Sequence, residues 1–457
     1  LKPWLDSLAR ACGCASIRLD AGDEMQGTAL SNATYGRGTI DALNRLDIDA
    51  AAIGNHEFDW SVDTLRARIG EAKYPFLSAN ITNGAGTARP DWATPWKLVT
   101  KNGVKVAVIG LTTTETPTAT ASRNVQGLSF GNEAQAIKRY LPEARPAADF
   151  VIVVAHSGAT CDSSTGGGNV ASCRGEVIDL ARQLDSGSVD LIVAGHTHLR
   201  VNTVVNGIPI IEAQSSARAI GVVDFVRAGG RRETRVELVT PYADQVKPDT
   251  ALTAALGHQQ QAVRNITERV VARIKLPLKR DGDEYGLGRL IADAQRAAGR
   301  ADVAIMNNGG IRSDLPEGAI TYGQAYEVQP FQNRLLRLTV KGDVLLDALE
   351  HCVGRGGRDH LLDCNVSGVE VWYDGSKAPG ERISRTRLAD GRTIDKNGAY
   401  TLAVTDFMAT GGSGFKMLIG APKEDLDVLD VDALVRYLGV LRAVEAPDDV
   451  RFHRTDH

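Results

Sequence analysis

Four short apolar runs in the chain each end in a cluster of polar residues. The runs are residues 16–21, 49–53, 150–155 and 189–194. Runs of this length that stop at a glycine or polar break are typical of buried β-strands. In open α/β sheets the carboxyl ends of the strands form one edge, and ligand sites lie along that edge. We therefore expect the four polar clusters to come together in the folded protein.

The side chains in these clusters are suited to binding a divalent metal. They are carboxylate, amide and imidazole groups without a thiolate, a ligand set that suits zinc, manganese or iron. A single cluster would be explained equally well by a polar turn with a capping Asn and an exposed His. Four repeats of the same arrangement favour a metal site. The residues concerned are Asp23, Asn55, His56, His156, His196 and His198.

The apolar periodicity predicts further strands and helices along the chain. Strands are expected at residues 104–110, 208–213, 220–226 and 302–306. Helices are expected at residues 3–12, 39–46, 61–71, 133–141, 248–273, 287–298, 343–352 and 431–440. Three consecutive glycines at 166–168 predict a mobile loop after His156.

The length of 457 residues exceeds what a single core usually serves, so two domains are expected. We place a first domain at residues 1–243, a linker helix at 244–273 and a second domain at 274–457.

The composition is that of an ordinary globular protein and excludes some classes of partner. Hydrophobic residues make up 43% and charged residues 24% of the chain. The 52 basic and 56 acidic residues give a net charge of −4, which argues against binding a nucleic acid polymer. No apolar run approaches the length of a membrane span. The pattern does not indicate an oligomeric state.

Cysteine spacing indicates an oxidising compartment. Cys161 and Cys173, and likewise Cys352 and Cys364, enclose short polar loops that contain glycine, which predicts two local disulfides. Six unrelated thiols in a cytosolic enzyme are the alternative. Cys12 and Cys14 are separated by one residue, so a bridge between them would be strained. The alternative is a bond from one of them to a segment before Leu1, which is not a natural first residue.

Six motifs in the chain are similar to those of a known family and follow one another in the family's order. They are GDEMQG at 22–27, GNHEFD at 54–59, AHSG at 155–158, GHTH at 195–198, NNGGIR at 307–312 and TDFMATGG at 405–412. With these motifs the chain resembles the two-domain 5'-nucleotidases of the calcineurin-like metallophosphoesterase superfamily, which include bacterial UDP-sugar hydrolases and ecto-5'-nucleotidases. The resemblance spans nearly the whole chain.

This resemblance implies an α/β fold with two bound divalent ions. The N-terminal domain would be a four-layer α/β/β/α metallophosphoesterase sandwich, and the C-terminal domain an α+β substrate-binding domain. Asp23 would bridge both ions, such as Zn or Mn, and His198 would belong to the second ion's site. The ligands completing the first ion's site would be Asn55, His156 and His196.

The resemblance also assigns roles around the substrate. His56 would stabilise charge on the phosphate or leaving group, oriented by Asp59. Arg312 would bind phosphate or carboxylate groups, and a base would stack between Phe331 and Phe407. The remaining residues expected to contact substrate are Asn307, Gly309, Asn333 and Ser413.

The chain departs from the family pattern in three places. No Asp-x-His precedes Asp23, so either the sequence begins late or half of the metal site is lost. Ser413 occupies the position where relatives usually carry an Asp that holds the ribose hydroxyls. Asp281 and Arg289 also differ from the residues usual at those positions.

The function that these observations predict is phosphate release from nucleoside 5'-monophosphates and related nucleotides by a periplasmic or secreted dimetal phosphohydrolase. A cyclic-nucleotide phosphodiesterase, or a pyrophosphatase acting on nucleotide-sugars or dinucleotides, is the alternative within the enzyme class. A catalytically inactive relative that binds nucleosides is the alternative outside it.

Overall fold

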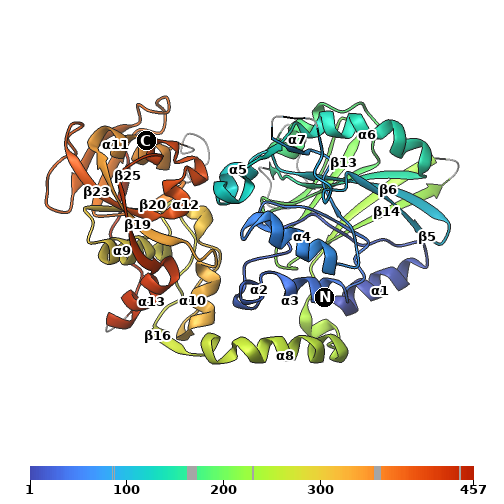
Figure 1. Cartoon of the computed structure of the whole chain (residues 1–457), viewed down its shortest axis with the longest axis horizontal. Coiled ribbons are helices and arrows are strands. Elements are labelled where there is room, and N and C mark those ends of the chain that lie inside the picture. The colour runs from blue at the N-terminus through green and yellow to red at the C-terminus, as the bar shows by residue number, and fades with distance from the viewer. Residues whose placement is uncertain are drawn as a thin grey trace. The chain divides into compact units, whose positions relative to one another are not determined.

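The computed structural model describes residues 1–456 apart from 85, 87, 162–171, 229–230, 355–361 and 442–443. The fold is mixed α/β and divides into two compact units (Figure 1). The first unit comprises Leu1–Gln26 and Thr34–Gln259, and the second comprises Gly27–Ala33 and Gln260–His457. The glycine run at 166–168, for which a mobile loop is expected, lies outside the described residues.

The first unit contains most of the strands. They are β1 (Leu19–Asp20), β2 (Ala50–Ala52), β3 (Phe76–Leu77), β4 (Ile81–Asn83), β5 (Trp96–Lys101), β6 (Val104–Thr112), β7 (Leu128–Phe130), β8 (Phe150–His156), β9 (Thr160–Cys161), β10 (Cys173–Arg174), β11 (Leu191–Ala194), β12 (Arg200–Val205), β13 (Ile208–Ala213), β14 (Ile220–Ala228) and β15 (Arg231–Val239). The helices are α1 (Lys2–Cys12), α3 (Arg37–Leu43), α4 (Val62–Glu71), α5 (Thr116–Ala119), α6 (Glu133–Ala147), α7 (Glu176–Arg182) and the first part of α8 (Thr250–Thr267), with short 3₁₀ turns η1 (His56–Phe58), η2 (Ser122–Val125) and η4 (Ala243–Gln245).

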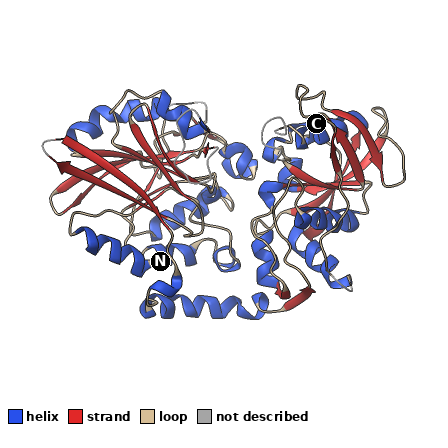
Figure 2. Ribbon diagram, turned by 180° about the vertical axis from the view of Figure 1, so that it is seen from behind, coloured by secondary structure: helices blue, strands red, loops and turns tan. Residues whose placement is uncertain are grey.

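Two sheets form the centre of this unit (Figure 2). The larger has the order β12-β13-β11-β8-β6-β5, with its four inner strands parallel and both edge strands antiparallel. The smaller has three parallel strands in the order β1-β2-β3. Figure 1 shows α6 and α7 along one side of the unit and α3 and α4 along the other.

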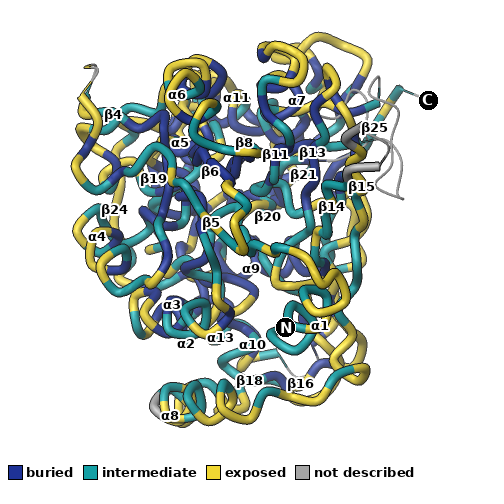
Figure 3. Tube along the Cα trace, turned by 90° about the vertical axis from the view of Figure 1, so that its right-hand side faces the viewer, coloured by how far each residue is buried: buried dark blue, intermediate teal, exposed yellow. Residues whose placement is uncertain are grey.

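Alternation along the strands builds a separate core on each face of the sheets. In β6, Val106 and Val108 join a core shared with the small sheet, whereas Ala107 and Ile109 join a core with α6 and α7. The period of two along a strand produces this split, because successive side chains point to opposite faces. Figure 3 shows the buried inner strands.

The second unit carries a five-stranded sheet with the order β20-β17-β23-β19-β24, a three-stranded sheet β22-β21-β25 and a pair β16-β18. Its strands are β16 (Val270–Ile274), β17 (Val303–Asn307), β18 (Gly318–Thr321), β19 (Arg334–Lys341), β20 (Cys364–Ser367), β21 (Val369–Tyr373), β22 (Ile383–Leu388), β23 (Ala399–Thr405), β24 (Lys423–Leu429) and β25 (Phe452–Arg454). Its helices are α2 (Ala29–Ala33), α9 (Gly286–Gly299), α10 (Tyr322–Val328), α11 (Gly342–Cys352), α12 (Asp406–Ala409) and α13 (Asp430–Val440), with 3₁₀ turns η5 (Asn308–Gly310), η6 (Gly412–Gly414) and η7 (Lys416–Leu418).

One expected element differs from the structure. A single linker helix was expected over 244–273, but α8 ends at Thr267 and Val270–Ile274 form β16. β16 pairs antiparallel with β18, and its β-branched residues Val270, Val271 and Ile274 favour a strand over a helix. A helix was expected through this segment because the spacing of apolar residues up to Val270 also fits the helical period.

The six cysteines form three pairs. Cys161–Cys173 and Cys352–Cys364 have Cα separations of 4.1 and 5.2 Å, which confirms the two expected local pairs. Cys12 and Cys14, whose partners the sequence left open, pair with each other at a Cα separation of 5.1 Å. Among the described residues, no helix combines the length and apolar character needed to cross a bilayer.

Candidate functional site

The loops that follow β1, β2, β8 and β11 converge in the first unit. β1 and β2 are neighbours in the small sheet, and β8 and β11 are neighbours in the large one. The four clusters therefore come from two sheets rather than from the single sheet edge that the pattern suggested. Both pairs are parallel, so their carboxyl ends lie together.

Three possible ligand atoms lie close to Nε2 of His156. Its Nε2 lies 3.1 Å from Asp23 Oδ2, 3.2 Å from Asn55 Oδ1 and 3.2 Å from His196 Nδ1. Donor atoms this close together are arranged as ligands of one ion would be. Among the described residues, Asp23, His156 and His196 also form the group of acidic and imidazole side chains whose ligand atoms all lie within 4.8 Å of one another.

The hydrogen bonds of His156 favour a cation in this cluster. Nδ1 lies 2.8 Å from the carbonyl oxygen of Ala21, which only accepts, so Nδ1 carries the proton. In a neutral imidazole Nε2 then presents a lone pair, and it faces oxygen lone pairs of Asp23 and Asn55. Without an ion, a proton on Nε2 relieves this repulsion, in keeping with a pKa of His156 that is raised to about 9. A divalent ion would take the place of that proton. The residues present therefore fit one metal ion.

The pKa values of Asp23 and His156 are shifted because the two side chains lie close together. Burial alone would lower the pKa of His156, but the Asp23 carboxylate outweighs burial and raises this pKa to about 9. For Asp23 the directions are reversed: burial would raise its pKa, but the nearby His156 and His56 outweigh burial and hold this pKa well below its usual range. Asp23 is thus available as an anionic ligand over a wide pH range.

A buried carboxylate shapes the loop that carries Asp23. Glu57 is fully buried, and its Oε2 accepts from the backbone N–H of Asp23 at 2.9 Å and of Gly54 at 2.6 Å. Its Oε1 accepts from the N–H of Met25 at 3.1 Å. Asp23 has φ 59, a left-handed conformation that these bonds sustain. Glu57 belongs to the GNHEFD motif, yet the sequence alone gave it no role.

His56 and Asp59 stand beside the cluster in contact with each other. His56 Nδ1 lies 2.8 Å from Asp59 Oδ2, and Asp59 Oδ1 accepts from the Thr120 hydroxyl at 2.8 Å. The contact follows from η1, whose turn brings residues three apart to one side. The other ring nitrogen of His56 is 3.9 Å from Asp23 Oδ2, so the imidazole borders the candidate metal site without joining its ligands.

His198 lies outside the converging group of ligand atoms among the described residues. Both His196 and His198 have left-handed backbones, with φ 78 and φ 60. A role for His198 at a second ion stays a prediction.

The second unit brings some of the expected substrate residues together. Asn307, at the end of β17, donates from its amide to the Ser413 hydroxyl at 2.9 Å. Arg312 lies with its guanidinium carbon 5.7 Å from the centre of the Phe331 ring. Gly309 forms part of η5, where its carbonyl accepts from Arg312 at 3.4 Å.

Two more expected substrate residues are fixed by their neighbours. Asn333 donates to the buried Asp430 at 3.3 Å. Phe407, in α12, is half-buried and packs against the main core of this unit. A side chain at Gly412 would clash with the Phe407 ring, which explains the glycine there.

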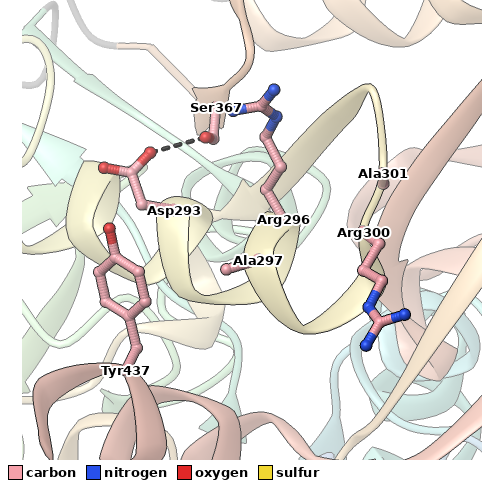
Figure 4. A pocket seen from close by; sticks show the side chains of 7 residues that line it. All are labelled: Asp293, Arg296, Ala297, Arg300, Ala301, Ser367 and Tyr437. Atoms are coloured by element: carbon pink, nitrogen blue, oxygen red, sulfur yellow. Dashed lines mark hydrogen bonds between the residues drawn. The ribbon is translucent and has the colours of Figure 1, made fainter. Parts of the chain in front are cut away.

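A pocket of about 320 Å³ lies elsewhere in the second unit (Figure 4). Its lining residues are Asp293, Arg296, Ala297, Arg300, Ala301, Ser367 and Tyr437. Asp293 is engaged with the Ser367 hydroxyl at 2.6 Å and with Arg451 at 2.8 Å. The pocket shares no residue with the candidate site, and we assign it no part in substrate binding.

Comparison with known proteins relates both halves of the chain to one group. Residues 266–419 match the family described as 5'-nucleotidase, C-terminal domain, and residues 19–211 match the family described as bacterial capsule synthesis protein PGA_cap. The chain is 31% identical over 417 residues to Endonuclease YhcR of Bacillus subtilis, a match that covers 86% of this chain and 33% of that protein. It therefore spans about a third of the length of that relative.

Two further relatives are matched over most of their length. Snake venom 5'-nucleotidase of Naja atra is 27% identical over 478 residues, covering 93% of this chain and 87% of the enzyme. The crystal structure of the 5'-nucleotidase precursor from Thermus thermophilus superposes with a TM-score of 0.86 at 26% identity, covering 100% of this chain and 93% of that one.

The fold defines a two-domain, mixed α/β protein of the class seen in the 5'-nucleotidase structure, and its Asp–His cluster is a candidate metal site. The chain belongs to the 5'-nucleotidase family, with an N-terminal metallophosphatase-like domain and a 5'-nucleotidase C-terminal domain.

Proposed function

We propose that this protein is a metal-dependent phosphohydrolase that binds two divalent ions and releases phosphate from nucleoside 5'-monophosphates and related nucleotides. The observation that carries the proposal is the convergence of Asp23, Asn55, His156 and His196 on one point. The family membership supports the reaction class, because relatives of this chain are named 5'-nucleotidases.

The layering of the first unit supports a metallophosphoesterase sandwich. One core joins α3 and α4 to the small sheet, a second lies between the two sheets, and a third joins the large sheet to α6 and α7. This order corresponds to the four-layer α/β/β/α arrangement. We assign the second unit to an α+β substrate-binding domain.

A divalent ion held by Asp23, Asn55, His156 and His196 would polarise a phosphoryl oxygen and lower the pKa of a nearby water. The chain's own residues then supply orientation and proton control. Asp59 holds the His56 imidazole through Nδ1, which leaves Nε2 directed to the side of Asp23. From that position His56 can donate a proton or a hydrogen bond to charge that develops on the phosphate or leaving group.

Substrate selection is assigned to the second unit. Arg312 offers a planar fork to phosphate or carboxylate, and Phe331 and Phe407 offer aromatic faces for a base. Asn307, Gly309, Asn333 and Ser413 complete the proposed contacts. The Ser413 hydroxyl already accepts from Asn307, so this pair can present one polar surface to a sugar or base.

We place the protein outside the cytoplasm, in the periplasm or as a secreted protein. The three cysteine pairs support this, since disulfides persist in oxidising compartments.

Cleavage of phosphodiesters is a second candidate, and one observation favours it. The relative at 31% identity is named an endonuclease, although this chain spans a third of that protein. The two functions differ in the number of bridging oxygens on the phosphorus that is attacked: a monophosphate ester has one, whereas a phosphodiester or the pyrophosphate of a nucleotide-sugar has two. Cyclic nucleotides, nucleotide-sugars and oligonucleotides therefore belong in the same test as the monophosphates.

The test combines metal analysis with a panel of substrates. We expect protein equilibrated with Mn²⁺ or Zn²⁺ to bind one ion at the Asp23–Asn55–His156–His196 cluster, and a second ion where further ligands accompany His198. We also expect it to release phosphate from AMP or UMP with a higher kcat/KM than it shows on cyclic AMP, UDP-glucose or a single-stranded oligonucleotide. Asp23→Asn, which keeps the side-chain shape, should lose both metal and activity. A preference for the diesters would replace the proposal with the second candidate, and metal-free protein that only binds nucleosides would overturn both.

A further inference from the structure

An acidic residue stands in the middle of an apolar strand of the first unit. Glu212 lies in β13, between Ile211 and Ala213, and only 1% of it is exposed. A buried carboxylate needs hydrogen-bond donors to offset the loss of water. The donors of Glu212 come from the two loops that carry His156, His196 and His198.

Both oxygens of Glu212 hold the segment between the two histidines of the GHTH motif. The Thr197 hydroxyl lies 2.8 Å from each oxygen. The backbone N–H of Leu199, directly after His198, donates to Oε1 at 3.3 Å. Glu212 therefore binds this turn at its centre, Thr197, and at its end, Leu199.

The same carboxylate also reaches the His156 loop. The N–H of Ala159 donates to Glu212 Oε2 at 3.4 Å, and the carbonyl oxygen of Ala159 lies 3.0 Å from Thr197 Oγ1. The two loops pack closely, since a side chain at Gly158 would come within 2.5 Å of Thr197 Oγ1. Glu212 is thus a common anchor for both loops.

The turn it holds has a strained backbone. His196 and His198 both have positive φ, 78 and 60, which residues other than glycine adopt only when their surroundings impose it. Thr197 lies between them, and its side chain is the one bonded to Glu212. Release of Thr197 would let the turn relax and carry His196 Nδ1 away from His156 Nε2, now 3.2 Å distant.

We propose that Glu212 is a positioning residue for the metal centre, which acts through Thr197 and Ala159 to hold His196 and His156 at the spacing a divalent ion requires. The inference rests on the proposed function only in taking these two histidines as metal ligands. Partners behind a ligand that fix its orientation commonly contribute 10–100-fold to metal affinity.

The variants Glu212→Gln and Thr197→Val test it. Gln has the size of Glu212, but its amide N–H₂ cannot accept a hydrogen bond from the backbone N–H of Ala159 or Leu199 that it would face. Val has the shape of Thr197 and lacks its hydroxyl. We expect each to weaken Mn²⁺ binding to the whole chain by about 10–100-fold, measured by calorimetric titration of metal-free protein. Because both side chains belong to one hydrogen-bond network, the loss of affinity in the double variant should be smaller than the sum of the two single losses.

A matched control separates positioning from general stability. Glu284, in the second unit, has a side chain that is 6% exposed, and its carboxylate also accepts from backbone N–H groups, those of Arg451 at 3.0 Å and Phe452 at 2.9 Å. Glu284→Gln should lower Tm while leaving Mn²⁺ affinity as in the parent. The visible spectrum of Co²⁺-loaded protein gives a second readout, and its bands should shift in the Glu212 and Thr197 variants but not in the Glu284 variant.

The outcomes are distinguishable. Parent-like Mn²⁺ affinity and Co²⁺ spectrum in Thr197→Val, or additive losses in the double variant, would overturn the positioning role. If Glu212→Gln does not fold, Thr197→Val alone decides. A parent protein that hydrolyses AMP with Mn²⁺ while all variants bind alike refutes this inference and not the proposed function. A parent that binds neither Mn²⁺ nor Zn²⁺ refutes both.

Discussion

His56 offers a test of the proposed chemistry at a single side chain. It borders the metal cluster, with Nε2 3.9 Å from Asp23 Oδ2, and is held by Asp59. Because it is not among the converging ligands, His56→Ala should keep the metal content and most substrate affinity. Turnover should fall by about 10²–10⁴-fold, the range usual for a positioned acid or charge-stabilising group. The measurements are kcat, KM and bound metal.

His258 provides the control for this substitution, because it is an exposed histidine in α8 of the same unit. His258→Ala should leave kcat, KM and metal content as in the parent. A rise in KM for His56→Ala with kcat unchanged would assign His56 to substrate binding instead of catalysis.

Asp430 predicts a pH dependence of stability in the second unit. It is 1% exposed, and burial raises its pKa to about 8 although Val431 N–H and Asn333 donate to it. Between the unfolded pKa of about 4 and this value the folded state binds one more proton than the unfolded state. The unfolding free energy therefore contains a contribution that is complete below about pH 4 and is lost as the pH rises to 8, at up to about 1.4 kcal/mol per pH unit.

Asp430→Asn removes that contribution. Urea unfolding at pH 5, 6, 7 and 8 should show a parent whose free energy of unfolding falls more steeply with pH than that of the variant. Other buried acids affect both proteins equally, so the difference between the two slopes isolates Asp430. Parallel slopes would mean that Asp430 is ionised in the folded protein.

Some residues of the candidate site could be predicted from the sequence and others could not. The four members of the metal cluster were predictable because each directly follows a recognisable strand. Glu57 and Glu212 were not, because most of their hydrogen-bond partners lie in loops distant in sequence. An acid at position 212 inside an apolar strand was the one available signal, since a buried carboxylate needs local donors.

At the scale of elements, hydrophobic periodicity predicted most of the longer helices and eight of the strands, but it did not predict the shorter strands or how the strands pair. The runs before the four polar clusters are strands, as expected. Their division between a three-stranded and a six-stranded sheet depends on contacts between the sheets, which periodicity along one strand does not encode. β16 was missed for a related reason: its antiparallel partner β18 begins 44 residues further on, at Gly318, and decides its conformation.

The packing of the two sheets against each other predicts the effect of a change at Gly110. This residue is buried in β6, where an added Cβ would clash with Leu77 of β3. The carbonyl of Gly110 also accepts from the N–H of Ala79 at 2.8 Å, which ties the segment after β3 to β6. Gly110→Ala should therefore destabilise the protein by about 1–3 kcal/mol through overpacking, measured as a loss of unfolding free energy in urea.

Gly70 is the matched control, since it is exposed in α4 and an added Cβ there meets nothing within 4 Å. Gly70→Ala should be neutral or stabilise by about 0.5–1 kcal/mol, because Ala restricts the unfolded chain. Equal effects at the two positions would contradict the close approach of the sheets at Gly110.

At the scale of the whole molecule, two domains were predictable from length, but the path of the chain between them was not. The short segment Gly27–Ala33 follows the Asp23 loop directly and yet belongs to the second unit. There the Asn32 amide donates to the carbonyl of Pro330 at 2.6 Å, next to Phe331. Nothing in the local pattern of this segment points to a partner about 300 residues away, so a boundary read from sequence alone omits it.

All four residues of the converging cluster lie in the first unit, which predicts that metal stabilises the two units unequally. Free Mn²⁺ at 100 times its Kd should stabilise the unit that binds it by about 2.7 kcal/mol. For a unit of this size that corresponds to a rise in Tm of roughly 5–11 °C. Calorimetry of metal-free and Mn²⁺-loaded protein should show one transition moving by this amount and another staying in place.

Tryptophan fluorescence can assign the moving transition to a unit. Of the five tryptophans, Trp372 alone lies in the second unit, so Trp372→Phe leaves emission that reports on the first unit only. In this variant the fluorescence midpoint should rise with Mn²⁺, and in Asp23→Asn it should not. Two transitions that move together, or a shift that survives Asp23→Asn, would mean that the ion stabilises the protein from somewhere other than the Asp23–Asn55–His156–His196 cluster, or that the two units unfold as one.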